Sequence, residues 1–233
     1  AREKGITAVV GATEAAQLTD GETVLVDAEN GTIEVNPNAE RVALAQQRTA
    51  TLAAIRSASS GPGRLADGHA VPLLANVGSI DSAREAAARG AEGVGLFRTE
   101  VLFLGAEKAP GIDEQADTYR AVFAEFPGQK VVVRVLDAGA DKPLAVLTDQ
   151  GEENPALGRR GLRALQAHEK VLRDQLTALA KAAAASDADV HVMAPMVSTA
   201  EEAAYFRAIA HESGISTAGV MVEVASAAIL ADH

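Results

Sequence analysis

The sequence contains no cysteine and no tryptophan, and aromatic residues make up only 3% of its 233 residues. Without cysteine, the chain has no disulfides, no thiolate metal ligands and no cysteine nucleophile. Because aromatic side chains are so few, we expect a core of alanine, valine, leucine and isoleucine. This composition favours an α/β protein, in which buried parallel strands are continuous apolar runs.

Positive charge is scarce as well. The 21 lysine and arginine residues are outnumbered by 32 aspartate and glutamate residues, and the formal net charge is −11. This balance argues against a basic nucleic-acid surface and against a polybasic membrane anchor. No apolar run approaches the ~18 residues of a membrane-spanning helix. We therefore expect a cytoplasmic protein that binds neither nucleic acid nor membranes.

The first 36 residues have a β-like character. Strands are expected over Thr7–Gly11, Thr23–Ala28 and Thr32–Asn36. Asn30 and Gly31 separate the last two runs and predict a hairpin, because both residue types tolerate positive φ. Residues 1–36 are therefore interpreted as the tail end of a small β-containing domain.

A helix and a loop are expected to follow. Pro37–Ala58 has no internal glycine or proline, and we expect a long helix with Asn36 as its N-cap and Pro37 in the first turn. Ser59–His69 is rich in serine, glycine and proline and is typical of a linker. Residues 37–69 are thus predicted to connect the first domain to a second domain over 70–233.

Strand and helix patterns alternate through the second domain. Strands are expected over Val71–Ser79, Gly93–Glu100, Lys130–Ala138, Val190–Met196 and Ala218–Val224. Helices are expected over Ser82–Ala91, Asp113–Glu125, Pro155–Gln166, Glu169–Ser186 and Ala200–Glu212, with a further helix at the end of the chain. This alternation predicts a parallel sheet. Five units are too few to close an eight-stranded barrel, so a barrel would be incomplete.

Two arginines fall near the carboxyl ends of neighbouring strands, where parallel α/β folds build their active sites. Glu100 follows Arg98 closely in the sequence, and Asp137 follows Arg134. Two guanidinium charges ~6 Å apart repel by roughly 3 kcal/mol at an effective dielectric constant of ~20. Either these carboxylates offset the repulsion, or an anionic ligand does. We favour the ligand, because guanidinium forks match phosphate and carboxylate oxygens.

Other polar residues near the strand ends carry weaker predictions. Glu223 follows an apolar strand and is a candidate Mg²⁺ ligand, since Mg²⁺ takes one or two carboxylates plus phosphate oxygens, although from the residues alone the metal role is the less favoured one. A helix N-cap or an ion pair with an arginine is the alternative role for Glu223. The turn Asp137–Leu144 is a weak candidate for anion binding. Within Arg159, Arg160 and Arg163, at least two side chains are expected on a solvated helix face.

Five motifs together resemble one protein family. They are "GAEGVGLFRTEVLFL" (Gly90–Leu104), "VVVRVLDAGADKPL" (Val131–Leu144), "EENPALGRRGLR" (Glu152–Arg163), "VMAPMVSTAEE" (Val192–Glu202) and "GVMVEVASAA" (Gly219–Ala228). Their order and spacing resemble Enzyme I, the phosphoenolpyruvate–protein phosphotransferase of the bacterial sugar phosphotransferase system. The opening "AREKGITAVVG" resembles the segment just after that family's phosphorylated histidine.

The resemblance implies a function. Phosphoenolpyruvate (PEP) is expected at the mouth of a (β/α)₈ barrel that follows a swivelling phosphohistidine domain and a linker helix. Arg98 and Arg134 match substrate-binding arginines, and Glu223 matches a Mg²⁺ ligand. The phosphoryl group is expected to pass to a histidine and then to the phosphocarrier HPr, in a homodimeric protein.

The resemblance also implies that parts of the family's site are missing. Its phosphoacceptor histidine is expected before Ala1, and an Asn-Asp pair, a third arginine and a cysteine are expected beyond His233. We therefore predict a fragment with no catalytic residue of its own, inactive alone. Two alternatives remain open. One is a pyruvate phosphate dikinase or PEP synthase, which carries an ATP-binding domain. The other is a non-catalytic binding or dimerisation fragment.

Overall fold

The computed structural model describes residues 6–58, 61–104, 108–138, 144, 147 and 158–232. The chain divides into two compact units, Ala1–Gly61 and Pro62–His233. Their boundary falls inside the segment 59–69 that the sequence marks as a linker. Within the described part of the chain, every helix is too short or too polar to cross a lipid bilayer.

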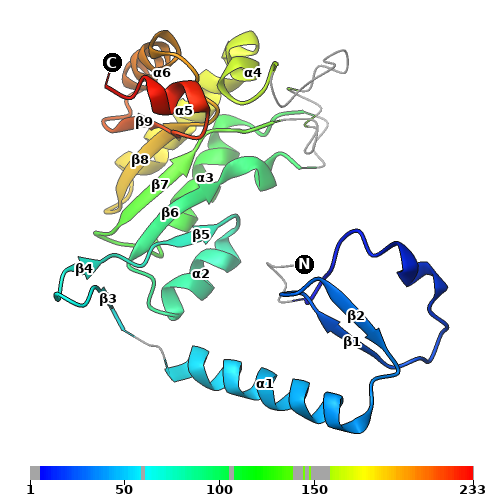
Figure 1. The fold of residues 1–233 in the computed structure, drawn as a ribbon. Coiled ribbons are helices and arrows are strands. Elements are labelled where there is room, and N and C mark those ends of the chain that lie inside the picture. Colours follow the sequence, from blue (N-terminus) through cyan, green and yellow to red (C-terminus); the bar gives the residue numbers. More distant parts are fainter. Residues whose placement is uncertain are drawn as a thin grey trace. The chain divides into compact units, whose positions relative to one another are not determined.

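The first unit contains a β-hairpin and one long helix (Figure 1). Strand β1 (Val24–Asp27) pairs antiparallel with β2 (Thr32–Val35), and Gly31 in the turn adopts a φ of +67°. Helix α1 spans Ala39–Ala58, and a short 3₁₀ helix, η2, spans Thr13–Gln17. The predicted hairpin at Asn30 and Gly31 is confirmed.

Two local predictions in this unit are wrong. Thr7–Gly11 forms no strand, because a β-prone run becomes a strand only where a neighbouring strand supplies hydrogen bonds. Asn36 does not cap α1, because it adopts the left-handed region with a φ of 50° at the end of β2. Asn38 is the cap instead, since its Oδ1 accepts a hydrogen bond from the Arg41 backbone at 2.9 Å.

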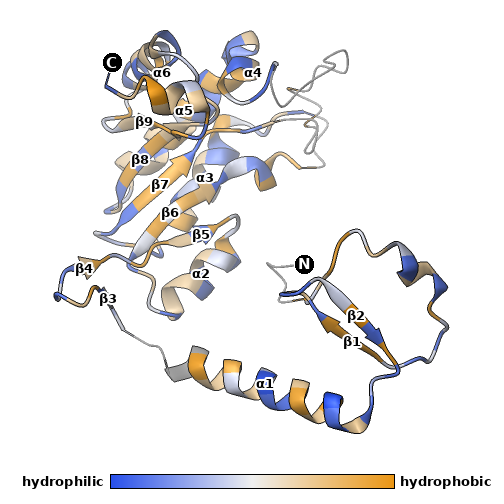
Figure 2. Cartoon of the chain, in the orientation of Figure 1, coloured by the Kyte–Doolittle hydropathy of each residue, from blue (hydrophilic) through white to orange (hydrophobic). Residues whose placement is uncertain are grey.

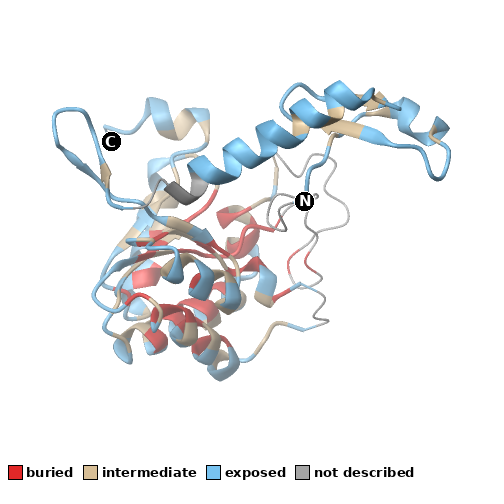
Figure 3. Ribbon diagram, turned by 90° about the horizontal axis from the view of Figure 1, so that it is seen from below, coloured by how far each residue is buried: buried red, intermediate tan, exposed pale blue. Residues whose placement is uncertain are grey.

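The first unit buries little of its surface. Arg41 pairs with Glu34 at 3.0 Å, and Arg48 pairs with Glu29 at 2.6 Å, so two ion pairs join α1 to the hairpin. None of residues 6–55 is fully buried, and Figure 3 shows α1 largely exposed. A unit without a buried core has little hydrophobic stabilisation of its own.

The second unit is built on a five-stranded parallel sheet with strand order β5-β6-β7-β8-β9. Its strands are β5 (Ala75–Val77), β6 (Gly93–Arg98), β7 (Lys130–Arg134), β8 (Asp189–Ala194) and β9 (Ala218–Val220). A small antiparallel pair, β3 (Gly63–Arg64) and β4 (Ala70–Val71), precedes it. The predicted parallel α/β sheet is thus confirmed, and most of the length of β6 to β9 has hydrophobic colours in Figure 2.

Helices connect the strands and cover the sheet. They are α2 (Ile80–Ala88), α3 (Ile112–Phe123), α4 (Leu162–Ala167), α5 (Glu169–Ala184), α6 (Ala200–Glu212) and α7 (Ala225–Ile229), with the 3₁₀ helix η3 (Thr99–Leu102) after β6. Helices α2, α3, α5 and α6 contact one another in this order and form one layer. Ser79 and Thr199 cap α2 and α6 through their hydroxyl oxygens.

The core between sheet and helices consists mostly of alanine, valine, leucine and isoleucine, as the composition predicts, and the few aromatic residues are added to it. All five phenylalanines are buried in it. Phe97 of β6 meets Tyr119 of α3 edge to face, with ring centroids 6.0 Å apart. A few aromatic residues therefore add large buried side chains to a mostly aliphatic core, because all five phenylalanines are buried.

Candidate functional site

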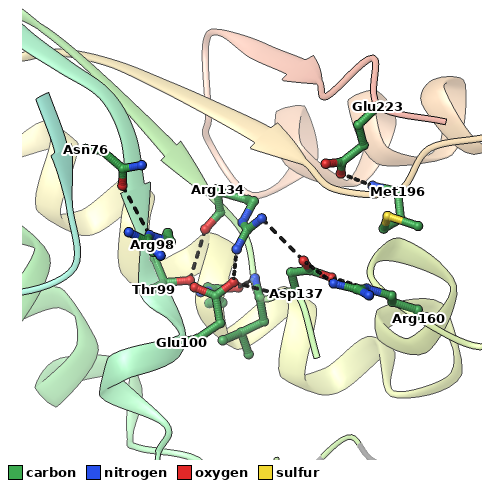
Figure 4. Close-up of polar contacts among 11 residues, drawn as sticks. Asn76, Arg98, Thr99, Glu100, Arg134, Asp137, Arg160, Met196 and Glu223 are labelled. Atoms are coloured by element: carbon green, nitrogen blue, oxygen red, sulfur yellow. Dashed lines mark hydrogen bonds and ion pairs between the residues drawn. The ribbon is translucent and has the colours of Figure 1, made fainter. Parts of the chain in front are cut away.

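The two predicted arginines lie side by side at the carboxyl edge of the sheet. Arg98 ends β6 and Arg134 ends β7, and their Cα atoms are partners in the parallel register. Arg98 Nε donates a hydrogen bond to Asn76 Oδ1 on β5 at 3.1 Å (Figure 4). A hollow of about 370 Å³ adjoins Arg98 and is also lined by Thr99, Ser79 and Arg84. Its volume lies within the usual range for small-molecule sites.

Arg134 is buried between two carboxylates. Its Nη2 donates to Glu100 Oε1 at 2.5 Å, and its Nη1 lies 3.3 Å from Asp137 Oδ2. The backbone N–H of Asp137 donates to the same Glu100 oxygen at 3.3 Å. For Arg134, internal neutralisation by Glu100 and Asp137 is therefore observed. A ligand is not needed to explain its burial.

Arg160 also belongs to this cluster, and the sequence analysis did not predict this role for it. Its Nε and Nη2 donate to the two carboxylate oxygens of Asp137, each at 3.2 Å. Arg163 also has fixed partners, since its Nη2 donates to Ser198 Oγ at 3.0 Å. The expectation that at least two of the three arginines are solvated is therefore wrong. The only sequence signal was the density of arginine after the glycine in "LGRRGLR".

Two atoms of the cluster are buried without a hydrogen-bond partner among the described residues. They are Glu100 Oε2 and Arg134 Nε. Buried polar atoms normally have hydrogen-bond partners, so this acceptor oxygen of Glu100 and this donor nitrogen of Arg134 are exceptions.

Glu223 follows β9, and β8 lies between β9 and β7, the strand that carries Arg134. The two successive strand spacings add up to about 10 Å. Glu223 Oε1 accepts a hydrogen bond from the Met196 backbone at 2.8 Å, and Met196 adopts a φ of 57°. The residue before α7 that acts as its N-cap is Val224, so Glu223 does not take the capping role.

The carboxylate of Glu223 meets one requirement of a Mg²⁺ ligand. It is exposed, and Met196 engages only one of its oxygens in the observed contact. No group of three or more acidic or histidine side chains with metal-binding geometry occurs among the described residues. A single carboxylate fits Mg²⁺ only if substrate oxygens and water complete the coordination, as Mg²⁺ commonly requires.

Part of the predicted site cannot be placed. Most of the turn Asp137–Leu144 and the predicted helix start at Asn154 and Pro155 lie outside the described residues. The described chain resumes at Gly158, and α4 begins at Leu162. Any anion contact made by the turn therefore stays a prediction.

Gly161 brings Arg160 to the cluster. It adopts a φ of +54°, and a Cβ there would lie 2.8 Å from Met196 Cβ and 3.2 Å from the Pro195 carbonyl oxygen. We expect G161A to lower the free energy of unfolding by about 2–3 kcal/mol, because backbone strain and a clash act together. Urea denaturation measures the loss.

Gly128 provides the matched control for this prediction. It has a φ of +70°, and a Cβ added there would meet no atom of the described residues within 4 Å. G128A should therefore lose only about 1 kcal/mol, the strain contribution alone. Equal losses in the two variants would show that the contact with Met196 does not matter.

Comparisons with known proteins agree with one another. A family model described as "PEP-utilising enzyme, PEP-binding domain" matches residues 53–233. The PEP-protein phosphotransferase of Streptomyces coelicolor is 49% identical over 233 residues, which cover 99% of this chain and 42% of that protein. The PEP-protein phosphotransferase of Haloferax volcanii is 40% identical over 247 residues, which cover 100% of this chain and 43% of that protein.

A relative with a different name is also similar. The multiphosphoryl transfer protein of Rhodobacter capsulatus is 37% identical over 224 residues, which cover 92% of this chain and 27% of that protein. The chain thus spans less than half the length of the curated relatives that it matches.

Proposed function

Because the chain belongs to the family of PEP-utilising enzymes, through their PEP-binding domain, we propose that it binds PEP at the carboxyl ends of its parallel strands. The observation that carries this proposal is the register of β6 and β7, in which Arg98 and Arg134 are direct neighbours. PEP is a compact trianion with one phosphate and one carboxylate. Two neighbouring guanidinium groups match both anionic ends.

The chemistry of phosphoryl transfer fits such a site. Transfer from PEP needs alignment and stabilisation of charge on the phosphoryl oxygens more than covalent participation by the protein. Arg134 is held in advance by Glu100 and Asp137, and a side chain that is already fixed does not need to reorganise during the reaction. Mg²⁺, when bound through Glu223, would neutralise further phosphoryl charge.

We propose that the chain binds PEP as one part of a larger protein that transfers the phosphoryl group. The relatives' name, PEP-protein phosphotransferase, supports transfer of the phosphoryl group from PEP to a protein. In this proposal a histidine of a swivelling domain accepts the group and passes it to HPr for sugar uptake. Residues 1–36 would end that domain, 37–69 would link it, and 70–233 would form part of a (β/α)₈ barrel.

Assembly and location are part of the proposal. Strands β5 and β9 form the two edges of the sheet, and an edge strand presents unpaired backbone groups that another strand can cover. We propose that the protein works as a cytoplasmic homodimer. Sedimentation of the intact protein measures the oligomeric state, and a monomer would contradict this part.

Calorimetric titration with PEP tests the binding proposal. The chain should bind PEP in the presence of Mg²⁺, and chelation of Mg²⁺ should weaken binding about tenfold, equivalent to 1.4 kcal/mol. E223Q should bind PEP weakly with or without Mg²⁺, because the amide is a poor Mg²⁺ ligand. E114Q, which removes an exposed carboxylate from α3, is the matched control and should behave like the unmodified chain.

The outcomes separate the two assignments. Absence of any PEP binding by the unmodified chain with Mg²⁺ would overturn the proposed function. Binding that stays Mg²⁺-dependent in E223Q would leave the function standing and remove Glu223 as the ligand.

A further inference from the structure

Four buried polar side chains connect the helix layer to the strand ends. They are Thr99 at the start of η3, Gln115 and Tyr119 on α3, and Gln175 on α5, and each is at most 1% exposed. The surrounding core is apolar. Because burying polar groups is unfavourable unless they are hydrogen-bonded, their contacts decide what they do.

Gln175 is the centre of this network. Its Nε2 donates to Thr99 Oγ1 at 3.0 Å and to Tyr119 Oη at 3.2 Å. Its Oε1 accepts from the backbone N–H of Leu136 at 3.1 Å. Both amide hydrogens and the amide oxygen are therefore engaged, and only one orientation of the amide satisfies all three contacts.

The network is anchored at its far end. Tyr119 Oη donates to Gln115 Oε1 at 3.0 Å, and Gln115 Nε2 donates to the Pro110 carbonyl at 2.8 Å. Burial raises the pKa of Tyr119, so the phenol stays protonated and remains a donor. Donors and acceptors alternate without conflict from Pro110 to Gln175.

At the strand ends, the network is hydrogen-bonded to the backbone of the residues that carry the arginine cluster. Thr99 Oγ1 donates to the carbonyl of Arg134 at 3.0 Å. Gln175 thus fixes the Leu136 amide directly and the Arg134 carbonyl through Thr99. The Arg134 carbonyl precedes Val135 and the Leu136 amide follows it, and Asp137 is the next residue in the chain.

We propose that Gln175 is a positioning residue for the PEP site. By holding the backbone at Arg134 and Leu136, it sets the starting points of the Arg134 and Asp137 side chains. The effect on PEP rests on the proposed function, whereas the effect on the backbone does not. Gln175 touches no ligand in this scheme and acts only through Thr99 and Leu136.

Q175M tests the proposal, because methionine keeps the length of the side chain and removes its hydrogen-bonding groups. We expect PEP binding at least about tenfold weaker in calorimetry. We also expect faster hydrogen exchange at the Leu136 amide and a shifted Arg134 Nε signal in nuclear magnetic resonance. L179A, on the same helix and in the same core, is the control. It should lower stability while leaving PEP affinity within about twofold.

The possible results discriminate between the claims. Unchanged PEP affinity in folded Q175M would overturn the positioning role. If the unmodified chain binds no PEP, the proposed function fails, and the exchange and Arg134 signals then decide the positioning role alone. If Q175M does not fold, T99V replaces it, since valine has the shape of threonine and removes both the hydrogen bond to the Arg134 carbonyl and the one from Gln175, while the bond from Gln175 to Leu136 stays. The same expectations for PEP affinity and the Arg134 signal apply to T99V, and wild-type values of both would overturn the proposal.

Discussion

Replacing Arg134 by methionine is expected to lower the free energy of unfolding by about 3–5 kcal/mol and to abolish PEP binding. The loss of stability follows because Glu100 and Asp137 lie within the cluster, and removal of the arginine leaves Glu100 as a buried, uncompensated charge. Asp137 keeps its contact with Arg160. Urea denaturation and calorimetric titration with PEP measure the two effects.

A double variant separates structure from binding. R134M/E100Q removes both charges of the buried pair, and such replacements are often close to neutral for stability. Glutamine at position 100 also keeps an acceptor for the Asp137 backbone N–H. We expect the double variant to recover most of the stability and none of the PEP binding. Recovery of both would mean that Arg134 has a structural role only.

Replacing Arg98 by methionine is expected to change stability little and to weaken PEP binding strongly. Arg98 is half-buried, and loss of its hydrogen bond to the neutral amide of Asn76 should by itself cost less than about 1 kcal/mol of stability. A charge-assisted bond to a phosphate contributes more, and PEP affinity should fall by about 10- to 100-fold. Thermal unfolding and PEP titration test both parts.

Arg84 is the matched control for this variant. It lines the same hollow as Arg98, but its guanidinium pairs with Glu125 at 3.1 Å. R84M should leave PEP affinity within about twofold, because the guanidinium of Arg84 is already paired with Glu125 and lies 3.7 Å from Asp81. If R84M and R98M weaken PEP binding equally, general positive charge and not a specific Arg98 contact supports binding.

The sheet was predictable because its signals are local. The strands of the parallel sheet lie within mostly apolar runs between helix patterns, and parallel strands buried in a sheet require such runs. The strands end earlier than the sequence indicated. β7 stops at Arg134, since the Leu136 N–H bonds to the Gln175 side chain and not to a neighbouring strand. No local pattern reveals a hydrogen-bond partner 39 residues away.

The site was predictable only in part, for a similar reason. Arg98 and Arg134 follow apolar runs directly, so their position at strand ends can be inferred from the sequence. Arg160 follows a segment without such a pattern, and its contact with Asp137 depends on the unusual backbone of Gly161. For Arg134 the sequence favoured a ligand as the counter-charge, whereas Glu100 and Asp137 supply it in the structure, because the same sequence is compatible with both solutions.

The order of strands and helices and the presence of paired arginines at strand ends follow from the sequence alone, because periodicity and strand polarity are properties of neighbouring residues. The tertiary structure decided which carboxylates hold Arg134, that Arg160 joins them, and that Gln175 supports the backbone beneath. These contacts join residues 23 to 76 positions apart. Long-range pairing depends on how whole helices pack on the sheet, and that geometry exists only after the chain has folded.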